Sequence, residues 1–110
     1  MKPAAIAAKS APACQTMADV RTGVDALDRE LVALLAQRFG YMDAAARIKA
    51  DRGAVRDEAR KAAVITNAET AAVAAGIPAG VTAQIWETLV EASIAYELAA
   101  WDRLRRQPPE

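Results

Sequence analysis

The residues of this chain that could do chemistry are charged and polar side chains that interrupt helical apolar stripes. Arg38 lies seven residues after Leu31, and Lys49 lies eleven residues after Arg38. At about 100° per residue of helix, both cations point within roughly 20° of the same apolar direction. Charges that point where a core should be need an anionic partner, and we therefore expect one for this pair.

Further candidates lie on or beside apolar positions. They include Arg60 and two residues spaced four apart, Ser93 and Glu97, which share one helical face. Arg21 precedes Arg38 by seventeen residues, so its direction differs by about 100° from the line of the first two cations. Arg21 therefore cannot easily reach the same pocket of its own chain, but it could reach a neighbour's.

The composition excludes several kinds of catalysis. The chain has no histidine, which removes the commonest general base and the commonest zinc ligand. Its single cysteine, Cys14, cannot form an internal disulfide and would lack the usual partner as a nucleophile. The net charge of zero gives a nucleic acid or an anionic membrane little electrostatic support. We expect no metal and no cofactor, so catalysis must depend on arginine, lysine, carboxylates, hydroxyls and positioning.

One long helix is predicted to position the first of these residues. From Asp19 to Asp51 apolar residues recur at three- and four-residue steps without a proline, and Asp19 is predicted to be the N-cap. Such a helix would be about 45–50 Å long, more than the ~30 Å width of a small domain. It is therefore expected to lie against a second chain.

Two further helices are predicted to carry the remaining candidates. One begins near Asp57, which is predicted to be its N-cap, and runs to about Ala75, where a Gly-x-Pro stop signal follows. The other is capped by Thr82 and runs through Trp101 before it frays. Alanine dominates the composition, and no strand pattern is longer than a few residues. The expected fold class is all-α.

The chain length indicates one domain with short flanking segments. Residues 1–17, rich in alanine and proline, are predicted to be a flexible arm, residues 18–105 the domain, and residues 106–110 a tail. No run of about 18 apolar residues exists to span a membrane. The opening segment is a poor export signal because its apolar patch is shorter than the usual ~7–15 residues. The cytoplasm is the expected compartment, with export by a weak leader as the alternative.

Together these residues resemble the all-helical (type II) chorismate mutases and their close relatives, the isochorismate-pyruvate lyases. The resemblance covers roughly residues 17–103. Its carriers are Arg21, Arg38, Lys49 in ARIKAD, the Val55-Arg56-Asp57-x-x-Arg60 run, and Ser93 and Glu97 in EASIAYE.

The resemblance implies an intertwined homodimer in which each pocket takes Arg21 from the partner chain. Arg21 and Arg38 would bind the substrate carboxylates, and Lys49 would contact the ether oxygen and a carboxylate. Asp57 would hold the ring hydroxyl, and Arg60 would complete the binding site.

The resemblance also assigns the last two residues of the set. Ser93 would lie beside the substrate. Glu97 stands where the commonest bacterial pattern has a glutamine that donates a hydrogen bond to the ether oxygen. Some family members use glutamate there, and the chemistry then requires a protonated carboxyl, because an ionised one would repel the developing charge. The implied catalytic residues are therefore Lys49, Glu97 and Arg38.

The implied reaction is the rearrangement of chorismate to prephenate, a shikimate-pathway step toward aromatic amino acids. It is unimolecular and pericyclic and needs no base, nucleophile or metal, which fits a chain without histidine. The alternative is isochorismate-pyruvate lyase, which yields salicylate and pyruvate; the Val-Arg-Asp-x-x-Arg run favours the mutase. A third possibility is a helical dimerisation module without chemistry, against which anion-binding residues on apolar faces argue.

Overall fold

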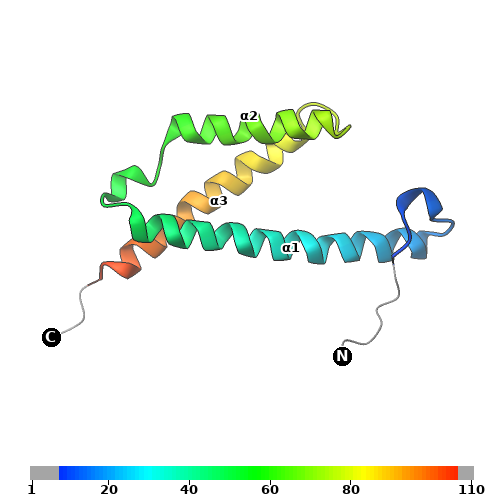
Figure 1. Cartoon of the computed structure of the whole chain (residues 1–110), viewed down its shortest axis with the longest axis horizontal. Coiled ribbons are helices and arrows are strands. Elements are labelled where there is room, and N and C mark those ends of the chain that lie inside the picture. Colours follow the sequence, from blue (N-terminus) through cyan, green and yellow to red (C-terminus); the bar gives the residue numbers. More distant parts are fainter. Residues whose placement is uncertain (1–7, 107–110) are drawn as a thin grey trace. The chain divides into compact units, whose positions relative to one another are not determined.

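The computed structural model describes residues 8–106, and this part of the chain is helical without a strand. The helices are η1 (Ala11–Ala13), α1 (Met17–Ile48), η2 (Arg52–Ala54), α2 (Glu58–Ala74) and α3 (Val81–Leu104), shown in Figure 1. The prediction of an all-α fold with a long, a short and a medium helix is confirmed. Over the same residues, none of the helices combines the length and the apolar character that crossing a membrane requires.

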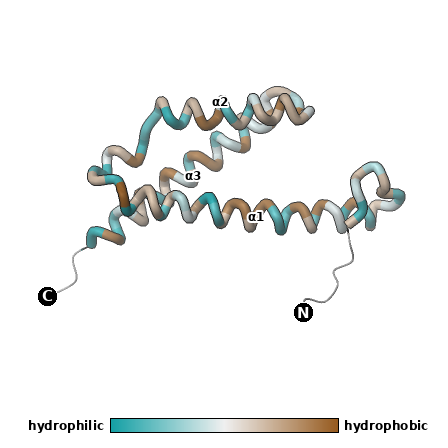
Figure 2. The backbone as a smooth tube through the Cα atoms, in the orientation of Figure 1, coloured by the Kyte–Doolittle hydropathy of each residue, from teal (hydrophilic) through white to brown (hydrophobic). Residues whose placement is uncertain are grey.

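The described residues belong to two compact units, divided after Arg38. The N-terminal unit holds η1 and the first part of α1. The C-terminal unit, from Phe39 on, holds the end of α1 together with η2, α2 and α3. Figure 2 shows that apolar and polar residues alternate along α1, as its amphipathic sequence predicts.

The start of α1 differs from the prediction because Asp19 is not its N-cap. The helix begins at Met17, and the Thr16 hydroxyl oxygen accepts a hydrogen bond of 3.1 Å from the Asp19 backbone N–H. The Asp19 carboxylate in turn accepts bonds from the backbone N–H groups of Thr16 and Gln15. This reciprocal arrangement is a capping box, in which Asp19 is the third helical residue. These bonds, with the Gln15 contact the strongest, lower the pKa of the Asp19 carboxyl.

The end of α1 also differs from the prediction, since the last helical residue is Ile48 and not Asp51. The backbone N–H of Lys49 still donates to the Ala45 carbonyl, at 2.9 Å. The chain then turns through the short 3₁₀-helix η2, which is centred on Gly53. The helix can end here because Trp101 on α3 and Arg105, directly after α3, donate to the carbonyl groups of Lys49 and Ala46.

The second helix has the predicted bounds to within one residue. The Asp57 side chain accepts a 3.0 Å bond from the Arg60 backbone N–H, so Asp57 is the N-cap as predicted. At the other end, Gly76 has a φ of 93°, which favours glycine. The backbone N–H of Ile77 donates to Ala72, and that of Gly76 to Val73, which is the Schellman pattern of helix termination.

The start of α3 shows that the predicted cap, Thr82, is wrong. The helix begins at Val81, and Thr82 is buried within its first turn. The backbone N–H groups of Gly80 and Ala83 instead donate to the two carboxylate oxygens of Glu69, at 2.6 and 3.2 Å. Glu69 lies on α2, so the acceptor for this helix terminus comes from a different helix. Because Glu69 lies outside the sequence around the start of α3, local capping patterns do not predict this contact.

Replacing Glu69 with alanine should therefore destabilise the C-terminal unit. Two backbone donors would lose their acceptor, and loss of a helix cap typically costs about 0.5–2 kcal/mol in the free energy of unfolding. Urea unfolding followed by circular dichroism measures this difference. Thr70→Ala, at the neighbouring exposed position, is the control. Equal stability of the two variants would show that the Glu69 bonds do not support α3.

The core of the C-terminal unit is small. Val55, Val90 and Ile94 are buried together, and further apolar side chains pack against them: Val64, Ile65, Trp86, Leu98 and Trp101. Two alanines, Ala46 on α1 and Ala100 on α3, are almost completely buried. Such small side chains allow close approach of the backbones that carry them. The bonds from Tyr96 to Asp43 and from Trp101 to Lys49 show that the end of α1 lies against the C-terminal half of α3.

Candidate active site

Lys49 and Glu97, predicted from separate parts of the sequence, form an ion pair in the C-terminal unit. The Lys49 Nζ donates to Glu97 Oε2 at 2.7 Å. The Glu97 side chain is only 5% exposed, whereas that of Lys49 is 31% exposed. A carboxylate so far removed from water needs a cation, and Lys49 supplies it. The anionic partner that the sequence analysis required for Lys49 is thus, in this state, a residue of the same chain.

Ser93 lies one helical turn before Glu97 on α3, as the spacing predicted. It is buried, with 3% of its surface exposed, and its hydroxyl donates a 2.7 Å hydrogen bond to the Leu89 carbonyl. This bond to the preceding turn is common for a serine within a helix, and the small side chain allows close packing. Ser93 therefore adds a small polar group beside Glu97.

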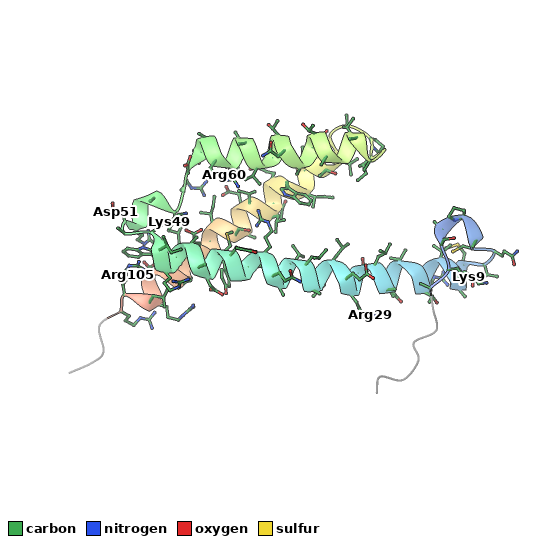
Figure 3. All side chains as sticks on the ribbon, viewed as in Figure 1. Lys9, Arg29, Lys49, Asp51, Arg60 and Arg105 are labelled. Carbon is green, nitrogen blue, oxygen red and sulfur yellow. The ribbon has the colours of Figure 1, made fainter. Side chains whose placement is uncertain are left out.

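Asp57 and Arg60 lie at the start of α2. The Asp57 carboxylate is used as the N-cap, and one of its oxygens accepts from the backbone N–H of Arg60. The Arg60 guanidinium makes no hydrogen bond or ion pair with any residue between 8 and 106. Figure 3 shows Lys49 by the end of α1 and Arg60 by the start of α2. The C-terminal unit thus presents an unpaired cation near the end that carries the Lys49–Glu97 pair.

Arg21 and Arg38 belong to the N-terminal unit. Both lie within α1, Arg21 exposed and Arg38 partly buried. Of the predicted set, the structure thus gathers Lys49, Ser93 and Glu97 around one stretch of α3, with Asp57 and Arg60 at the start of α2 in the same unit. The roles assigned to Arg21 and Arg38 remain predictions.

The connection between α1 and α2 is held by a network of ion pairs that the sequence analysis did not identify. The Arg56 guanidinium binds both oxygens of Glu91 on α3, at 2.8 and 3.0 Å, and also contacts Glu58. Lys61 joins Glu91 to Glu87 at 2.9 and 2.7 Å. Arg56 therefore fastens the segment before Asp57 to α3. The sequence signal that could have identified Arg56 is its place next to Asp57 in the Val-Arg-Asp-x-x-Arg run.

This network is expected to make stability depend on pH through Glu91. Hydrogen bonds from Arg56 and then Lys61 lower the pKa of Glu91 from 4.5 to about 2. A carboxyl with a lowered pKa stabilises the folded state above its unfolded pKa and loses that effect as the pH falls through its folded pKa. Wild type should thus have a higher Tm than Glu91→Gln at pH 7, and the difference should vanish between pH 4.5 and about 2.

Thermal unfolding of both proteins across this range measures the effect. Glu30→Gln, an exposed position on α1 outside the network, is the control and should match wild type at every pH. A Tm difference between wild type and Glu91→Gln that persists unchanged at pH 2 would contradict the assignment.

A groove of about 430 Å³ lies between the last turns of α1 and the C-terminal part of α3, outside the predicted site. It is lined by Gly40, Asp43, Ala44, Arg47, Tyr96, Arg103 and Leu104. The Tyr96 hydroxyl donates to Asp43 at 2.9 Å, and this contact raises the pKa of the phenol. None of the predicted site residues lines this groove. Between residues 8 and 106, no three side chains of the His, Cys, Asp and Glu types gather as metal ligands would.

Comparison of the sequence with known proteins identifies the family of this chain. The family model of type II chorismate mutases matches residues 20–98, which include every predicted site residue. A curated relative, isochorismate pyruvate lyase from Pseudomonas aeruginosa, is 28% identical over 92 residues, covering 84% of this chain and 91% of the relative. With a match over most of its length, the chain belongs to the chorismate mutase type II family.

Proposed function

We propose that this protein is a chorismate mutase that rearranges chorismate into prephenate. The observation that carries the proposal is the Lys49–Glu97 pair, an ammonium group beside a buried carboxyl within the residues that match the family model. Such a pair offers two hydrogen-bond donors to one ether oxygen when the carboxyl is protonated. The cytoplasm remains the compartment that we expect.

The reaction needs positioning and electrostatic stabilisation. The substrate is a dianion that must be held in a compact chair, which fixed cations can do by binding its two carboxylates. Its ether oxygen gains negative charge as the C–O bond breaks, and donors directed at that oxygen stabilise the transition state. In the proposed mechanism, the substrate carboxylates replace Glu97 as the counterion of Lys49. Glu97 then takes a proton from solvent and becomes the second donor to the ether oxygen.

The second candidate activity is isochorismate-pyruvate lyase. The name of the relative from Pseudomonas aeruginosa favours it, since the similarity extends over 84% of this chain. The same arrangement suits this reaction, because it also breaks the C–O bond of an enolpyruvyl ether in a doubly charged substrate. The Val-Arg-Asp-x-x-Arg run favours the mutase.

Separate incubations with chorismate and isochorismate distinguish the candidates. Prephenate from chorismate supports the mutase, whereas salicylate and pyruvate from isochorismate support the lyase. Lys49→Ala is the control for turnover by a contaminating enzyme and for uncatalysed reaction. If neither substrate reacts faster than with Lys49→Ala, both enzymatic proposals fail and a helical dimerisation module remains.

We further propose that the active form is a homodimer in which Arg21 serves the partner's site. The support comes from large apolar side chains along α1 in the N-terminal unit, which are exposed in the single chain. Leu27, Leu31 and Leu34 are 59%, 56% and 58% exposed. Burial of such side chains stabilises association by roughly 25 cal/mol per Å² of apolar area. A second copy of α1 offers the same apolar side chains and is the proposed occupant.

Mixing two inactive variants tests the shared site. Arg21→Ala and Lys49→Ala should each have little activity as homodimers. After the two are unfolded and refolded together, half of the dimers are mixed, and each mixed dimer has one site with both residues intact. The mixture should therefore recover about a quarter of wild-type activity. Recovery of no activity would contradict the contribution of Arg21 across the interface.

A further inference from the structure

The backbone groups of Lys49 form hydrogen bonds, as its side chain does. Its carbonyl oxygen accepts two hydrogen bonds, one at 3.0 Å from the indole Nε1 of Trp101 on α3 and one at 2.7 Å from the guanidinium of Arg105, the residue directly after α3. Its backbone N–H donates to the Ala45 carbonyl at 2.9 Å. Lys49 follows the last residue of α1, where backbone groups would otherwise have no partner within the helix.

Arg105 extends this contact to the end of α1. A second guanidinium nitrogen donates to the Ala46 carbonyl at 2.9 Å, and the group lies over the Trp101 ring, 4.2 Å from its centroid. A cation at a helix C-terminus interacts favourably with the helix dipole and satisfies its free carbonyl groups. Figure 3 shows Arg105 and Lys49 at the same end of the C-terminal unit. Arg105, at the C-terminal end of α3, thus acts as a cap for α1.

Three residues spaced four apart, two of α3 and its C-cap residue Arg105, therefore bind the side chain and the backbone of Lys49. Glu97 binds the ammonium group, while Trp101 and Arg105 bind the backbone carbonyl. Residues at this spacing lie in one row along a helix. We propose that Trp101 and Arg105 are positioning residues that fix where the Lys49 ammonium meets the substrate. This inference rests on the proposed function for its catalytic consequence, but the contact itself can be tested without turnover.

The positioning matters because a lysine side chain is long and flexible. If its backbone moved, the ammonium group could still pair with Glu97 but would no longer be placed for the ether oxygen. A misplacement of about 1 Å can cost up to 100-fold in rate. Trp101 also packs against the core, so its replacement would change core packing as well as the position of Lys49. Arg105 is exposed and offers the cleaner test.

The kinetic experiment compares Arg105→Ala and Arg105→Lys with Arg52→Ala as the matched control. Arg52 also fastens the end of α3, through two bonds to Asp102 at 2.8 and 3.2 Å, but does not touch Lys49. Arg105→Ala should lower kcat about 10- to 100-fold with a smaller change in KM. Arg105→Lys should recover part of the loss, and Arg52→Ala should remain near wild type. An equal loss in Arg52→Ala, or none in Arg105→Ala, would overturn the proposal.

A double-mutant cycle shows whether Arg105 acts through Lys49. If it does, Arg105→Ala should have no further effect on the residual rate once Lys49→Ala is present. A full additional loss in that background would overturn the proposal, because the two residues would then act independently.

The ammonium resonance of Lys49, measured by NMR with ¹⁵N-labelled lysine and assigned with Lys49→Arg, gives a readout that needs no substrate. It should shift or broaden in Arg105→Ala and in Trp101→Phe, and should match wild type in Arg52→Ala. An unchanged resonance in Arg105→Ala would overturn the positioning role. If the wild-type protein turned over neither substrate, the proposed function would fail, and this measurement would still decide the contact.

Discussion

Replacing Lys49 with alanine is expected to lower kcat/KM by at least 10²–10³-fold, the loss typical of removing one donor from a developing oxyanion. Lys49 is bonded to Glu97 at 2.7 Å, and the proposed mechanism gives it both a substrate carboxylate and the ether oxygen. Steady-state kinetics with the substrate identified above measures the loss. Rates like those of wild type would remove Lys49 from the mechanism.

The same substitution also affects stability, and this must be separated from catalysis. Without Lys49, the carboxylate of Glu97 would be buried without a counterion, a situation that costs about 3–5 kcal/mol in a fully buried pair. The cost here should be smaller, since the Lys49 side chain is 31% exposed and water screens the pair. The double variant Lys49→Ala/Glu97→Gln removes the buried charge. It should regain stability while remaining inactive, which would assign the lost activity to Lys49 itself.

Local sequence patterns predicted the helices better than their ends. The α2 helix has the expected bounds because its signals are local: Asp57 caps it, and Gly76 ends it. The start of α3 depends on Glu69, eleven residues before Gly80, and the end of α1 depends on Trp101 and Arg105. These acceptors and donors come from other helices. Their effect appears only once tertiary packing has brought the helices together.

In the candidate site, too, the sequence predicted individual residues better than the contacts between them. Lys49 and Glu97 were each identified from the sequence, but their mutual pairing follows from the packing of α1 on α3 and was not predicted. Trp101 packs against the core, and its indole N–H in addition donates to the Lys49 carbonyl. The row Glu97, Trp101, Arg105 was present in the sequence as a four-residue spacing. The spacing alone could not show that these three residues contact Lys49.

The Glu97→Gln variant is expected to lose less activity than wild type as the pH rises. In the proposed mechanism Glu97 donates to the ether oxygen only when it is protonated, so wild-type activity should decrease as the pH rises. A glutamine amide donates at every pH and carries no charge that could repel the ether oxygen. The variant should therefore keep a nearly flat profile of kcat/KM and exceed wild type at alkaline pH.

The measurement is kcat/KM across the pH range for wild type and Glu97→Gln, with Glu30→Gln as the control for an unrelated carboxylate. The structure sharpens the expectation, because Glu97 in this state is bonded to Lys49 at 2.7 Å. The ionised pair keeps the ammonium group engaged with Glu97 and so opposes both of its proposed contacts with substrate. Glutamine cannot form that ion pair, which should favour substrate binding and lower KM at neutral pH. A variant profile that parallels wild type would show that Glu97 is not the group that must stay protonated, and the second donor to the ether oxygen would have to be sought elsewhere.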